Sequence, residues 1–181
     1  MIAALAGGAC GTTEPKVNLT AVTVDTGRLF ALSGTDPIFP TAINIPARVV
    51  VLTTVLSDGT VPFDLAFDLT PAGKVRVLPP RSVLLGPNVV PSIVGLFVST
   101  ATFDATVEAP VGGFTYDSVQ TVNPGQPFVV QMQPRDCAFS VLRTMHAKMV
   151  VDSVNLVSRL IYYRLALNPN CGRRGLVPGG Y

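Results

Sequence analysis

Residues 137–155 read CAFSVLRTMHAKMVVDSVN, and residues 156–171 read LVSRLIYYRLALNPNC. Two long apolar-rich runs therefore stand between a cysteine at each end. This pattern predicts a strand pair whose ends are joined by a disulfide between Cys137 and Cys171. A disulfide that closes a loop of about 34 residues contributes about 3.8 kcal/mol to stability in the chain-entropy model. We therefore expect a stapled hairpin in the last third of the chain.

Two secondary structures compete over residues 142–153. Helical spacing is followed by Leu142, Met145, Met149 and Ser153. An alternating strand would instead turn one set of side chains to the core, namely Met145, Ala147, Met149 and Val151. The following run alternates in the same way, with Ile161, Tyr163, Leu165 and Leu167 inward. The β-branched and aromatic residues of this second run favour two strands, with a turn near Asn155.

Strand-like segments separated by turn signals continue through the rest of the chain. Its 16 proline and 16 glycine residues are scattered without a period, which is typical of many turns and short elements. We expect an all-β fold of roughly nine to eleven short strands. The predicted domain spans residues 16–171 as an antiparallel two-sheet sandwich of Ig-like or jelly-roll-like topology, or as a distorted barrel. Residues 172–181 show no period and are expected to form a C-terminal tail.

The clearest hairpin signal lies in the first half of the chain. Residues 49–56 lead through an Asp58-Gly59 turn into residues 63–69. In the second of these strands the odd-numbered residues would face the core, with Asp64 and Asp68 on a solvated face opposite. One of these aspartates would then lie across from a basic residue of the next strand, Lys74 or Arg76, as a weak surface ion pair.

Proline positions suggest how the neighbouring segments end. Residues 41–45 and 48–56 are expected to form one edge strand interrupted at Pro46, because proline cannot donate to a β ladder. A further short strand is expected at residues 82–85, in the proline-rich connection between the two sheets. This interpretation makes the first strand of the predicted hairpin part of an edge strand.

The composition restricts the possible partners. Of 181 residues, 48% are hydrophobic and only 13% are charged, and the net charge is +2. Few charges over a large surface indicate an exposed apolar face or a large core. The only adjacent basic residues are Arg173 and Arg174, which are too few for a phosphate-binding patch. We therefore expect no nucleic-acid partner.

The N-terminal residues MIAALAGGACGTTEP (1–15) are small and apolar up to Cys10 and polar after it. This segment resembles the end of a bacterial lipoprotein signal peptide, in which a cysteine after small residues becomes lipid-modified. The resemblance implies that Cys10 is the lipidation site and that residues 1–15 are a signal-peptide remnant and tether, with the true start upstream of Met1. The odd cysteine count agrees, because Cys10 remains after Cys137 and Cys171 pair. The expected location is the bacterial cell envelope, or secretion.

Candidate catalytic residues are few. His146 is the sole histidine. A zinc site is not expected around it, because such a site needs three or four nitrogen or sulfur ligands. His146 is expected to be a solvated strand residue. No serine stands in a Gly-x-Ser-x-Gly turn. His146, Asp64 and Asp68 are the weak candidates if the protein is an enzyme. We expect no catalytic, metal or cofactor site.

The expected function is therefore non-catalytic: binding to, or assembly with, other envelope or extracellular proteins, including self-association. Its contact with the membrane would be through the lipid anchor alone. The alternatives are a hydrolase with a shallow loop-built site and a carbohydrate- or ligand-binding module. A polar pocket holding His146 with serine and aspartate would favour the hydrolase. A flat apolar patch or an unpaired edge strand would favour assembly.

Overall fold

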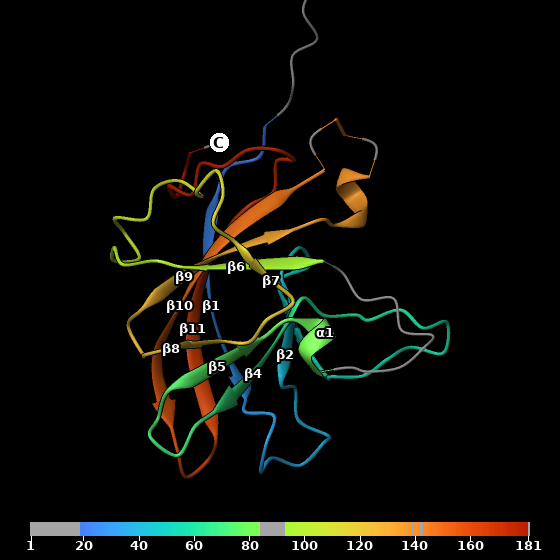
Figure 1. The fold of residues 1–181 in the computed structure, drawn as a ribbon, viewed down its shortest axis with the longest axis vertical. Helices are drawn as coiled ribbons and strands as arrows, with labels where there is room; N and C mark the ends of the chain where they lie inside the picture. Colours follow the sequence, from blue (N-terminus) through green and yellow to red (C-terminus); the bar gives the residue numbers. More distant parts are fainter. Residues whose placement is uncertain (1–18, 84–92, 139, 142, 181) are drawn as a thin grey trace, which may run out of the picture.

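The computed structural model describes residues 19–83, 93–138, 140–141 and 143–180. Within these residues the chain forms two antiparallel sheets that are not closed into a barrel (Figure 1). One sheet has six strands in the order β1-β11-β10-β9-β6-β7, and the other has five in the order β3-β2-β4-β5-β8. The predicted all-β sandwich is confirmed, and the eleven strands found here agree with the expected number.

The strands are β1 (Thr23–Phe30), β2 (Ala42–Asn44), β3 (Val49–Val51), β4 (Leu65–Leu69), β5 (Val75–Leu78), β6 (Val94–Val98), β7 (Thr115–Tyr116), β8 (Gln120–Val122), β9 (Pro127–Met132), β10 (Met145–Asn155) and β11 (Leu160–Asn168). A helical turn, α1 (Pro80–Val83), and a 3₁₀ turn, η1 (Arg135–Cys137), are also present. The strand expected at residues 82–85 is therefore wrong for Ser82 and Val83, and residues 84–85 lie outside the described ranges.

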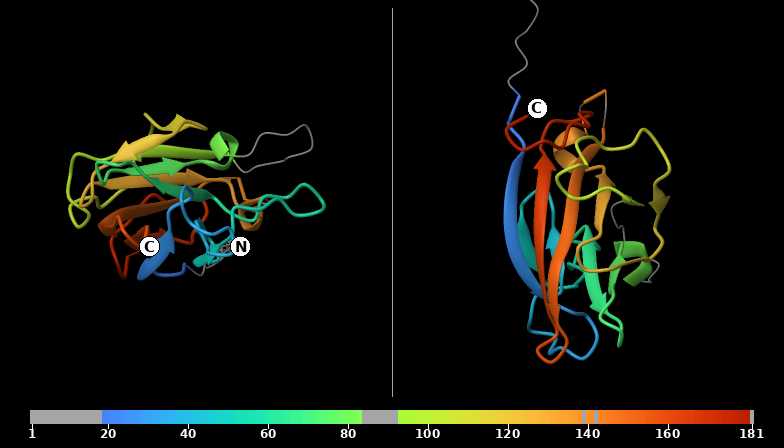
Figure 2. Two further views of the ribbon diagram at one scale, coloured as in Figure 1. Left: turned by 90° about the horizontal axis from the view of Figure 1, so that it is seen from below. Right: turned by 90° about the vertical axis from the view of Figure 1, so that its left-hand side faces the viewer.

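The hairpin of β10 and β11 lies in the interior of the six-stranded sheet, between β1 and β9. Strand β11, in red, lies between β1, in blue, and β10, in orange, in Figures 1 and 2. The turn is closed by Asn155, whose side-chain oxygen accepts hydrogen bonds from the backbone N–H groups of Val157 and Ser158. The strand interpretation of this region is confirmed, and its alternation directs the expected residues into the core.

The main core lies between the two sheets. Both contribute buried apolar side chains to it, including Leu29, Phe67, Val77, Leu96, Phe128, Met149 and Leu165. Burying a side chain of this size contributes about 1.5–3 kcal/mol in transfer free energy. These contacts fix the two sheets against each other and position the edges of the sandwich.

The pairing of the five-stranded sheet differs from the expected hairpin. Strand β3 pairs with β2, and β2 pairs with β4. The turn at Asp58-Gly59 does form, since Gly59 has a φ of 81° and the Leu56 N–H donates to the Thr60 carbonyl. The expectation that residues 49–56 pair with residues 63–69 is nevertheless wrong, because a turn signal predicts a reversal and not the neighbour of a strand.

The segment around Pro46 is a reversal. It joins β2 to β3, which run antiparallel, and Arg48 adopts a φ of 58° just before β3. The expectation of a single interrupted strand is therefore wrong. The edge position is correct for β3, which stands at the end of the five-stranded sheet.

Residues 172–180 lie against the domain, contrary to the expected tail. Leu176 is fully buried, and its N–H donates to the carbonyl of Val107. The carbonyl of Gly180 accepts a hydrogen bond from the N–H of Val22, beside the start of β1 (Figure 1). The lack of a period in this segment reflects irregular backbone that is held by tertiary contacts.

Candidate functional site

The predicted disulfide is present. The Cα atoms of Cys137 and Cys171 are 5.6 Å apart and their sulfurs are bonded. Cys137 ends η1 and Cys171 follows β11, so the bond joins the two ends of the β10–β11 hairpin. A structural disulfide fits an extracytoplasmic location. The predicted lipidation site, Cys10, lies outside the described residues.

His146 is 2% exposed, so the expectation that it is solvated is wrong. Its Nδ1 lies 2.9 Å from the backbone carbonyl of Arg173 and its Nε2 lies 3.1 Å from Gln131 Nε2. Because a carbonyl only accepts, Nδ1 carries the proton and Nε2 accepts from the Gln131 amide. The amide oxygen of Gln131 in turn accepts from the Tyr116 hydroxyl. Burial lowers the pKa of His146.

This chain of hydrogen bonds accounts for His146 as a structural residue. The partners found for its ring in the described part of the chain include no serine and no carboxylate. Asp68 is in β4 of the five-stranded sheet and Asp64 directly precedes that strand, whereas His146 is on β10 of the other sheet. The three weak catalytic candidates are therefore not brought together.

Asp68 is 4% exposed, although it was expected on a solvated face. Its carboxylate accepts hydrogen bonds from the Ser33 hydroxyl, the Leu69 N–H and the Arg159 guanidinium. Burial alone would raise the pKa of Asp68, but these hydrogen bonds and the Arg159 charge outweigh burial and hold the pKa below its ordinary value. The expected cross-strand pair with Arg76 forms at 3.7 Å.

Asp64 is 7% exposed, so its expected solvation is also wrong. Its Oδ2 accepts a hydrogen bond of 2.8 Å from the backbone N–H of Ile45. No basic side chain in the described residues forms a salt bridge with it. Burial raises the pKa of Asp64 from 3.8 to about 6, although the Ile45 hydrogen bond lowers it. The Asp64 carboxyl group therefore holds the backbone N–H that follows β2, and no basic side chain of the described residues offsets its negative charge.

Lys148 is a buried residue that sequence reasoning missed. It is 1% exposed, and its Nζ donates to the carbonyls of Phe103 and Thr106 at 2.7 and 2.9 Å. The ammonium also lies 4.6 Å from the centre of the Phe103 ring. Burial lowers the pKa of Lys148, although the charge of Asp104 opposes this. This lysine fixes the loop after β6 over the outer face of β10.

The backbone of β3 presents a free edge. Asp64 N–H donates to the Ile43 carbonyl, so the backbone groups of Ile43 point toward β4. Those of Ala42 and Asn44 therefore point toward β3, where their partners are Val51 and Val49. It follows that the N–H and C=O of Val50 point away from β2. No strand within the described ranges lies on that side.

The side chains along this edge are apolar. Residues 49–56 read VVVLTTVL and contain no charge. Of the 17 exposed large hydrophobic side chains in the described residues, seven lie between positions 38 and 56: Ile38, Phe39, Val49, Val50, Leu52, Val55 and Leu56. The edge strand β1 of the other sheet differs, because it carries Asp25, which is paired with Arg48, and Arg28. Charges on an edge oppose pairing with another chain.

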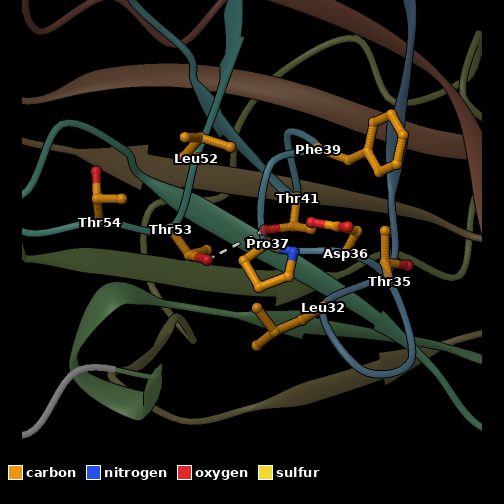
Figure 3. A pocket seen from close by; sticks show the side chains of 9 residues that line it. All are labelled: Leu32, Thr35, Asp36, Pro37, Phe39, Thr41, Leu52, Thr53 and Thr54. Carbon is orange, nitrogen blue, oxygen red and sulfur yellow. Dashed lines mark hydrogen bonds between the residues drawn. The ribbon is translucent and has the colours of Figure 1, made fainter.

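A pocket of about 260 Å³ lies beside the end of β3 (Figure 3). Its walls come from two segments, the loop that follows β1 and the residues that follow β3. Nine residues line it: Leu32, Thr35, Asp36, Pro37, Phe39, Thr41, Leu52, Thr53 and Thr54. The hydroxyls of Thr41 and Thr53 are hydrogen-bonded across it at 3.1 Å. From the sequence, this region was recognisable only as a cluster of turn residues followed by an expected edge strand.

Among the described residues, no group of three or more histidine, cysteine, aspartate or glutamate side chains is placed to hold a metal ion. In the same ranges, none of the helices has the length and apolar character needed to cross a membrane.

Comparison with known proteins gives no relative. No protein-family model matches the chain, and neither a curated protein nor a solved structure shows significant similarity to it. The candidate site is therefore the free edge of β3 and the adjoining pocket, both defined by geometry alone.

Proposed function

We propose that this protein is a non-catalytic binding or assembly component outside the cytoplasm, and that a strand of another protein pairs with the outer edge of β3. The observation that carries this proposal is the outward-directed backbone of Val50 within an uncharged, exposed apolar run. Strand addition uses both features, because backbone hydrogen bonds give affinity and alternate side chains give specificity.

The energetics favour β3 over the other edges. Each new backbone hydrogen bond contributes about 0.5–1.5 kcal/mol net. Covering Val49, Val50 and Leu52, which are 36–48% exposed, adds about 25 cal/mol per Å² of buried apolar surface. An incoming strand at β1 would have to desolvate Asp25 and Arg28 instead. At the opposite ends of the sheets, β7 has only two residues, and β8 is as short as β3 but carries the polar residues Gln120 and Thr121.

A proline at Val50 is the sharpest test of strand pairing. Because the Val50 N–H is not part of the β2–β3 ladder, Val50→Pro removes the outward donor and leaves the internal hydrogen bonds in place. We expect its free energy of unfolding to stay within about 1 kcal/mol of the wild type. Wild-type protein in native extracts should sediment as a complex larger than its 19.0 kDa chain, and Val50→Pro should sediment as the free chain.

The matched control is Val50→Thr, which keeps the N–H and the β-branched shape. It should keep the complex. A complex of unchanged size in Val50→Pro would contradict pairing at this edge. If the purified wild type alone forms a dimer that Val50→Pro abolishes, the partner is a second copy of the chain.

The proposed location depends on Cys10. The resemblance to a lipoprotein signal and the disulfide between Cys137 and Cys171 support an anchored protein of the bacterial cell envelope, or a secreted one. Cys10→Ser should move the protein from the membrane fraction to the soluble fraction, while its thermal unfolding midpoint stays the same. An unchanged membrane fraction in that variant would refute the anchor and leave the β3 proposal standing.

A further inference from the structure

The pocket beside β3 lies where a pairing strand would continue. Leu52, Thr53 and Thr54 follow directly after β3 and form one wall. A strand that bonds to the free edge at Val50 advances about 3.3 Å per residue. Within one or two residues it therefore reaches the mouth of the pocket. Alternate side chains of that strand point to the same face, so one of them faces the pocket.

The lining combines apolar walls with one carboxylate. Leu32, Phe39 and Leu52 supply apolar surface. Asp36 lies in the opposite loop, and its Oδ1 accepts a hydrogen bond from the Ile38 N–H. Within the described residues, no lysine, arginine or histidine forms a salt bridge with this carboxylate.

The size of the pocket limits its occupant. Pockets for whole small-molecule ligands usually measure about 300–1,000 Å³. At about 260 Å³ this pocket is below that range and suits a single long side chain. The negative carboxylate of Asp36 favours a positively charged hydrogen-bond donor.

We infer that the pocket receives a lysine or arginine side chain of the strand that pairs with β3. This inference rests on the proposed function and names the chemistry of the partner: an apolar extended segment with one basic residue. The aliphatic stem packs against Leu32, Leu52 and the Phe39 ring, and the charged group donates to the Asp36 carboxylate. The backbone pairing supplies affinity, and the pocket selects the sequence and fixes its register.

Synthetic peptides test the inference with the full chain. The probes are blocked octapeptides of alternating valine and threonine, in which one lysine is moved through all eight positions, and a matching set with norleucine. Binding is measured by calorimetry. The lysine peptide of the correct register should bind at least tenfold more tightly than its norleucine counterpart. Asp36→Asn should remove this preference.

The control variant is Asp152→Asn, which removes the same charge from a residue outside the pocket and should leave the preference intact. Val50→Pro should abolish the binding of every peptide. Equal affinity of lysine and norleucine peptides at all positions would refute the pocket inference while strand pairing stands. A lysine preference that survives Asp36→Asn would also refute it. Failure of all peptides to bind would overturn both proposals.

Discussion

Replacing Cys137 and Cys171 together with alanine lowers the free energy of unfolding by about 3.8 kcal/mol. The disulfide spans 34 residues, and this value is the loop-closure entropy that it removes from the unfolded chain at that length. Cys137 is fully buried in the main core, so the smaller side chain adds a packing loss to this value. The chain has no tryptophan, and far-UV circular dichroism in urea therefore follows unfolding.

The control for this prediction is chemical reduction. Reductant should lower the unfolding free energy of the wild type by a similar amount and leave that of the double variant unchanged. A loss below about 1 kcal/mol in the double variant would contradict the assigned role of the bond. In that case the β10–β11 hairpin would be held by its core contacts alone.

Stability between pH 7.5 and 4.5 depends on Asp64. Its pKa is raised by burial to about 6 in the folded chain, against 3.8 as the ordinary value. The folded state therefore binds more protons than the unfolded state between these two values, and the contribution of Asp64 to stability grows as the pH falls. The full shift corresponds to about 3 kcal/mol, of which about 2 kcal/mol falls between pH 7.5 and 4.5.

The comparison with Asp64→Asn isolates this effect, because an amide keeps an acceptor for the Ile45 N–H and does not titrate. The unfolding free energy of the wild type should rise by about 2 kcal/mol relative to Asp64→Asn as the pH falls from 7.5 to 4.5. Asp68→Asn is the matched control. The pKa of Asp68 is lowered, so its stabilisation is lost only below about pH 4, and its difference from the wild type should stay nearly constant in this range. A constant difference for Asp64→Asn as well would show that Asp64 remains ionised in the folded protein.

The sequence predicted the elements that depend on local alternation. The two cysteines bracket β10 and β11, and the period of two placed Met145, Met149 and Leu165 in the core correctly. Which strands pair with each other was harder to predict from the sequence. Strand β2 has only three residues, so its position between β3 and β4 left little trace in the pattern.

Burial of the second face of each sheet could not be predicted either. Alternation assigns His146, Lys148 and Asp68 to the face away from the core, and it does not show what covers that face. The segment after Cys171 covers His146, and the loop after β6 covers Lys148. The pocket likewise joins residues that follow two different strands, β1 and β3, and so depends on their tertiary arrangement.

The most direct test of strand pairing is the amide hydrogen exchange of Val50. The measurement compares the protein in its native complex with the purified chain in dilute solution. Because the Val50 N–H points outward from β3, it should exchange rapidly in the free chain and at least tenfold more slowly in the complex. The Val49 N–H, already within the β2–β3 ladder, serves as the internal reference and should change much less. Exchange of Val50 at the same rate in both samples would contradict pairing at β3.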